Sequence, residues 1–168
     1  MPAGLKQSSS VVSIGFGVTE AVAGTMAQAS VDLNLSPLDR EVFVVLAINL
    51  DSSTPELVPG GTTQIRSGLT TTSQTVMPQL SDANCLGRLS QTIRSAGGEG
   101  VSFQSGALET PPATLDYIGI IATNDFFVQV QSTGQPSNAS MTGKLYGYRA
   151  TATADIFAAL VQSEVLSA

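Results

Sequence analysis

Period-two alternation of apolar residues is the feature that most constrains what this chain can fold into. Residues 28–35 place every second side chain on one apolar face, which is typical of a half-buried β-strand. Residues 41–50 follow the same period but are apolar on both faces, with Val42 and Val44 on one and Phe43 and Val45 on the other. A strand with two apolar faces belongs in the centre of a packed structure. The pattern therefore predicts a half-buried strand at 28–35 and a central strand at 41–50.

The second half of the chain repeats this signal. Strands are predicted at 115–122, 126–131 and 140–152, and the three residues 123–125 are short enough to join the first two as a tight antiparallel connection. Three consecutive antiparallel strands would form a meander. A threonine-rich stretch at 62–76 has the β-propensity for one or two exposed strands at the surface.

Two segments show helical spacing instead. Cys85, Leu89 and Ile93 recur at every fourth position, Ser81 is a suitable N-cap, and a pair of glycines at 97–98 ends the pattern. A second helix is predicted at 154–166, capped by Thr153 and placed to plug one end or edge of the sheets.

These elements predict a mainly β fold: an antiparallel β-sandwich, jelly-roll-like, with two short helices at about 81–96 and 154–166. The expected division is an N-terminal arm or first strand at 1–18 and a single β-sandwich domain at 19–168. Residues 11–18 alternate only in part, so they fit equally a strand of their own domain and a strand added to a neighbour's sheet.

Composition limits the chemistry available. The 168 residues include no histidine and no tryptophan, and 12% are charged against about 25% in an ordinary soluble domain. The chain therefore lacks the commonest general base and metal ligand, so we expect no enzyme, no catalytic residues, no cofactor and no metal site. A net charge of −6 argues against direct binding of nucleic acid. The longest apolar run, 42–48, is too short to cross a membrane as a helix.

The individual candidates for chemistry are weak. Cys85, the single cysteine, has no histidine to activate it and is interpreted as a small buried apolar group. Asp116 and Asp125 flank an apolar strand, where acidic residues usually form solvated turns. The Gly-x-Gly sequences at 15–17 and 98–100 are interpreted as bends or bulges, and the glycosylation pattern at 138–140 is discounted because the chain shows no export signal.

The surface is rich in serine, threonine and glutamine but poor in lysine, of which there are only Lys6 and Lys144. Lysine is depleted in protein interfaces, where charges cost desolvation. We interpret the neutral polar surface as one that packs against copies of itself or a neighbouring subunit.

Three stretches resemble small virion structural proteins of tailed or marine viruses, bacteriophages included. They read LDYIGIIATNDFFVQV at 115–130, KLYGYRA at 144–150 and ALVQSE at 159–164. The resemblance implies a β-sandwich or jelly-roll fold, trimers or larger rings, and a place in or on an icosahedral shell. No catalytic residue comes with it.

The predicted function is that of a virion structural protein, either a capsid decoration (cement) subunit or a capsid subunit. Its expected partners are itself, as a homo-oligomer such as a trimer, and a neighbouring capsid protein, with no direct nucleic acid and no membrane. Its expected location is the virion. The alternative is a β-sandwich module that binds a glycan or peptide through the loop side chains of Asn124, Asp125, Asn138 and Tyr148. An enzyme is the weakest reading.

Overall fold

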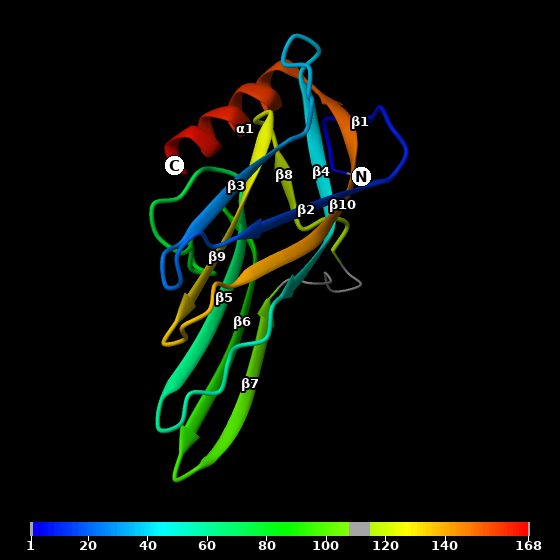
Figure 1. Cartoon of the computed structure of the whole chain (residues 1–168). Coiled ribbons are helices and arrows are strands. Elements are labelled where there is room, and N and C mark those ends of the chain that lie inside the picture. The colour runs from blue at the N-terminus through cyan, green and yellow to red at the C-terminus, as the bar shows by residue number, and fades with distance from the viewer. Residues whose placement is uncertain (1, 108–114, 168) are drawn as a thin grey trace.

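The structure is a computed structural model that describes residues 2–107 and 115–167. It consists of two antiparallel five-stranded sheets and a C-terminal helix (Figure 1). Sheet A contains β1 (Leu5–Gln7), β2 (Val12–Thr19), β10 (Ser140–Ala152), β4 (Glu41–Ser52) and β8 (Gly119–Ile121). Sheet B contains β3 (Ala27–Asp32), β9 (Asp125–Thr133), β5 (Thr62–Thr70), β6 (Cys85–Ala96) and β7 (Glu99–Ala107). The helix is α1 (Ala154–Ser167), which confirms the helix predicted at 154–166.

Eight of the strands pair in a nested order. Leaving β1 and β7 aside, the first strand pairs with the last (β2 with β10) and the second with the seventh (β3 with β9). The third pairs with the sixth (β4 with β8), and the fourth with the fifth (β5 with β6). A long hairpin folded over itself into two sheets gives this order, which is the strand order of a jelly roll. The predicted mainly β, antiparallel sandwich is confirmed.

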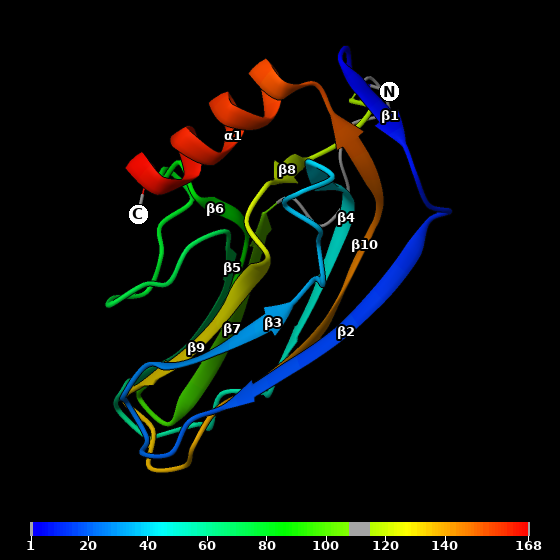
Figure 2. The same ribbon diagram turned by 90° about the horizontal axis from the view of Figure 1, so that it is seen from above.

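The molecule has two apolar cores, and β4 contributes to both. Phe43 and Val45 point into the core between the sheets, whereas Val42 and Val44 point into a second core that includes Ile156 and Leu160 of α1. This double burial is why residues 41–50 are apolar on both faces. The predicted central strand is therefore confirmed, since β4 lies between β10 and β8. The expected position of α1 is one end or edge of the sheets; in the structure its apolar side packs on the outer face of sheet A (Figure 2).

The helix predicted at 81–96 is wrong, because residues 85–96 form strand β6 between β5 and β7. A spacing of four is also a multiple of two, so Leu89 and Ile93 share one face of a strand as well as one face of a helix. The expected N-cap region is a turn, in which the Asp82 carboxylate accepts a hydrogen bond from the Gln79 N–H at 2.8 Å. The glycines at 97–98 both have positive φ and form the tight turn between β6 and β7.

The structure also differs from two predictions about strands, one on which strands are neighbours and one on which strand is exposed. Strands β8, β9 and β10 follow one another in the chain but do not form a meander, since β8 and β10 lie in sheet A and β9 lies in sheet B. The connection at 122–124 crosses between the sheets instead of making a hairpin. The threonine-rich stretch at 62–76 contains a strand as predicted, β5, but this strand is not exposed: it is central in sheet B, and Ile65 and Leu69 are fully buried. Hydroxyls such as that of Thr63 fit inside because their hydrogen bonds are satisfied.

The N-terminal residues lie along one edge of sheet A. Strands β1 and β2 pair with successive parts of β10, so residues 5–19 cover the side of β10 that faces away from β4 (Figure 2). Within a single chain, residues 12–19 therefore complete the chain's own sheet. The division into 1–18 and 19–168, and an exchange of this segment between copies, stay predictions.

Candidate functional site

One end of the sandwich is organised by a buried glutamate. Glu20, just after β2, is 2% exposed, and its carboxylate accepts hydrogen bonds from the N–H and hydroxyl of Ser132 and from the Ala139 N–H at 2.7–2.8 Å. The Glu20 N–H in turn donates to the Ala139 carbonyl at 2.9 Å. Charge-assisted hydrogen bonds of this kind are among the strongest in proteins. They fix the connection between β9 and β10 against the start of the connection between β2 and β3.

The opposite end is held by a glutamate from the helix. Glu164 of α1 is 8% exposed and accepts hydrogen bonds from the N–H groups of Ala122 and Thr123 at 2.7 and 3.0 Å. Burial raises the pKa of this carboxyl, and these hydrogen bonds oppose the rise only in part. The contact ties α1 to the connection between β8 and β9.

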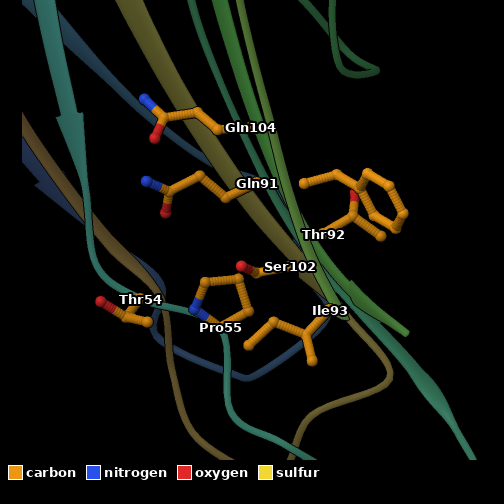
Figure 3. A pocket seen from close by; sticks show the side chains of 8 residues that line it. Thr54, Pro55, Gln91, Thr92, Ile93, Ser102 and Gln104 are labelled. Carbon is orange, nitrogen blue, oxygen red and sulfur yellow. The ribbon is translucent and has the colours of Figure 1, made fainter. Parts of the chain in front are cut away.

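A hollow of about 320 Å³ lies on the inner face of sheet B, where β6 and β7 face the connection after β4 (Figure 3). Gln91 is opposite Ile65 in the strand register, and Ile65 belongs to the core between the sheets, so Gln91 and its neighbour Gln104 face inward. The Oε1 atom of Gln91 is buried and has no hydrogen-bond partner among residues 2–107 and 115–167. The hollow is lined by Thr54, Pro55, Gln91, Ile93, Ser102 and Gln104, and it is bordered by Thr92 and Phe103, whose side chains point to the outer face of the sheet.

This lining determines what the hollow can bind. It contains no charged side chain, and it combines amides and hydroxyls with the apolar surfaces of Pro55 and Ile93. A neutral ligand with both hydroxyl groups and an apolar face, such as a sugar, matches this chemistry. An O–H donor would also satisfy the unpaired Oε1 of Gln91.

The outer face of sheet B carries a cluster of cations, which we call the arginine face. It consists of the outward-facing residues Gln64, Arg66, Arg88, Ser90, Thr92, Arg94, Phe103 and Gln131. In the register, Arg66 lies opposite Ser90 and Arg88 opposite Gly68, so the two arginines are diagonal neighbours. The pKa of Arg66 is lowered by burial and by the positive charge of Arg88. Arg66 also donates to the Gln131 amide oxygen at 2.9 Å.

The composition of the arginine face is that of an interface. The outward positions of β5, at 62–70, and of β6, at 88–96, contain arginine, glutamine, threonine, serine, glycine and alanine but no lysine or carboxylate. Phe103 and Val101 of β7 are 55% and 57% exposed beside them. Interfaces are enriched in arginine and aromatic residues and depleted in lysine and acidic residues.

The residues that the sequence singled out for binding do not meet in one place. Asn124 lies between β8 and β9, where its side chain accepts a hydrogen bond from the Leu35 N–H at 2.7 Å, and Asp125 begins β9. Asn138 lies in the connection between β9 and β10, at the other end of β9. Tyr148 is buried in the core under α1, and burial raises its pKa, as does the nearby Asp116.

Cys85 and the acidic candidates offer little reactivity. Cys85 is 7% exposed, its thiol donates to the Gly87 carbonyl at 3.5 Å, and burial raises its pKa, which disfavours the reactive thiolate. Within residues 2–107 and 115–167 there is no group of three histidine, cysteine, aspartate or glutamate residues placed to hold a metal ion. None of the described helices has the length and apolarity to span a bilayer.

Sequence patterns did not predict the buried glutamates, the hollow or the arginine pair. Glu20 and Glu164 look like ordinary surface acids, because their partners are backbone groups 41 to 119 positions away. Gln91 and Gln104 occupy inward positions of β6 and β7, and the helical spacing of residues 85–93 concealed β6. A period-two reading of residues 85–96 would have placed Arg88 and Arg94 on one face.

Comparisons with known proteins place the chain in no family: no family model matches it, and no curated protein matches it. Among solved structures, a chain from Desmodium yellow mottle tymovirus is similar at 14% identity, with 92% of this chain and 95% of that chain covered and a TM-score of 0.33. A TM-score of this size does not establish a shared fold.

Proposed function

We propose that this chain is a structural subunit of a virion shell, either a capsid subunit or a decoration subunit attached to another protein's shell. The nested strand pairing is the observation that carries the proposal, because jelly rolls with this order recur in capsid domains. The same architecture also serves lectins and cupins, so the choice among them depends on surfaces and not on the fold.

The surfaces favour assembly over catalysis. The arginine face offers a broad, neutral-to-basic surface with exposed Phe103 and Val101, on a chain whose net charge is −6. Such a face is complementary to the carboxylates found elsewhere on the same protein, which supports contacts between copies. A stable contact of standard size buries about 1,600 Å² in total. The proposal includes no catalytic step and no contact with nucleic acid or membrane.

A second candidate function is glycan or peptide binding. The uncharged hollow between β6, β7 and Pro55 supports it, since no described residue donates a hydrogen bond to the buried Oε1 of Gln91. A glycan array compares the native protein with Gln91→Leu and with Gln64→Leu, a control on the outer face of the same sheet. Loss of a sugar signal in Gln91→Leu alone would support this function.

The shell proposal is tested by the absolute mass of the purified protein, measured by light scattering after size exclusion, with electron microscopy of each peak. Closed particles would support a capsid subunit. A discrete ring or trimer would support a decoration subunit. A strict monomer at high concentration that also binds a glycan through Gln91 would overturn the proposal in favour of the binding module.

A further inference from the structure

The outer edge of sheet A is formed by β2, which pairs on one side only. Its eight residues follow β10 in unbroken register from Val12 opposite Gly147 to Thr19 opposite Ser140. In the part of the chain that the structure describes, no other strand pairs with β2. The backbone N–H and C=O groups of its second edge therefore point to solvent, where they form a template for another strand.

Proteins usually protect such an edge, and β2 has none of the usual protection. No charged residue and no proline occurs from Gln7 to Thr19, and the register with β10 contains no bulge. The edge strand β8, in contrast, is only three residues long. At the start of β2, Val11 and Val12 are 56% and 40% exposed, which adds apolar surface to the free edge.

The side chains of β2 allow close approach. Ser13, Gly15, Gly17 and Thr19 lie on the outer face, and a Cβ placed at Gly15 would meet no atom within 4 Å. Ile14 and Phe16 lie on the inner face and are only half-buried, so a strand added beside them would cover their remaining apolar surface.

We infer that β2 pairs antiparallel with β2 of a second copy, so that the two A sheets join into one continuous sheet across a two-fold axis. A second copy is the occupant that fits, because an uncharged strand places no like charges opposite each other when it meets itself. Antiparallel pairing extends the order already present in sheet A, and a two-fold contact uses the same patch on both copies. This inference does not depend on the proposed function.

Cross-linking tests the pairing. In a Cys85→Ala background, single cysteines are placed at Ser13, Gly15, Gly17 and Thr19, with Thr142→Cys on the interior strand β10 as control. In an antiparallel pair only residues near the strand centre meet their own symmetry mates, at a separation that a disulfide can bridge. We expect cross-linked dimers at position 15 or 17, little at 13 and 19, and none at 142. Equal cross-linking at all four positions would mean parallel pairing and would overturn the inference, as would cross-linking at none.

A charge placed on the same edge gives a second readout. Gly15→Glu adds a side chain that the monomer accommodates opposite Lys144, but in the dimer it brings two carboxylates together across the axis. We expect loss of the dimer with an unchanged thermal midpoint, whereas Thr142→Lys, on the same face, keeps the dimer. An oligomer that persists in Gly15→Glu would overturn this pairing and leave the shell proposal standing. A β2-paired dimer that never forms rings or particles would support this pairing and overturn the shell proposal.

Discussion

Glu20 and Ser132 lie 112 positions apart in the chain and are joined by two hydrogen bonds, from the Ser132 N–H to Oε1 at 2.7 Å and from its hydroxyl to Oε2 at 2.8 Å. The same carboxylate accepts the Ala139 N–H, so a single side chain satisfies three buried donors from β9 and the connection after it. This end of the jelly roll is fixed by polar contacts as much as by apolar packing.

Replacing this carboxylate should be costly. Glu20→Ala leaves three buried donors unpaired, and we expect a loss of about 3 kcal/mol in the free energy of unfolding. Urea denaturation measures it. The control, Asp51→Ala, removes an exposed carboxylate of β4 and should change stability by less than about 0.5 kcal/mol. Equal effects of the two variants would refute the anchoring role of Glu20.

Glu164 should make stability depend on pH. Because burial raises its pKa in the folded state, the folded protein binds a proton more tightly than the unfolded chain. Its contribution is therefore largest below the ordinary glutamate range and declines as pH rises through the raised pKa. The free energy of unfolding of the native protein minus that of Glu164→Gln, measured with urea from pH 4 to pH 8, should fall with rising pH. If this signed difference instead rises with pH, the hydrogen bonds from Ala122 and Thr123 outweigh burial.

Val44 should not tolerate a charge. Its side chain is fully buried under α1, so Val44→Asp places an unpaired carboxylate in an apolar core at a cost on the order of 5 kcal/mol, comparable to the whole stability of many domains. We expect loss of soluble expression. Val22→Asp, at a position that is 64% exposed, should express normally. A normal yield and melting temperature for Val44→Asp would contradict the second core.

The pair Arg66 and Arg88 should lower the stability of the monomer and strengthen the contact between copies. Arg88→Gln removes the like charge beside Arg66 and should stabilise the monomer by about 0.2–1 kcal/mol, less at high salt. If the arginine face binds carboxylates of another copy, the same variant weakens the oligomer. Thermal melts in low and high salt together with light scattering measure both effects, and Lys144→Gln on sheet A serves as the control. If Arg88→Gln assembles as well as the native protein, the arginine face is excluded as an interface.

Features that depend on the local pattern of residues were predictable from the sequence, and features that depend on distant tertiary partners were not. Strand β4 was predictable because its two apolar faces are written in consecutive residues, and α1 because its apolar stripe has helical period. Strand β6 was missed because its apolar residues are four apart, a spacing that strands and helices share. The buried glutamates were missed because a carboxylate in a sequence does not show which distant N–H groups will surround it.

The sequence by itself determined the class of the fold: alternating strands, one amphipathic C-terminal helix and a nearly uncharged polar surface. Only the tertiary structure decided which strand pairs with which, and so that β9 leaves its neighbours β8 and β10 for the other sheet. The physical reason is that the side-chain period of a strand depends on its own residues, whereas its hydrogen-bond partners are backbone groups that every residue carries. The nested order, the free edge of β2 and the arginine face all follow from that choice of partners.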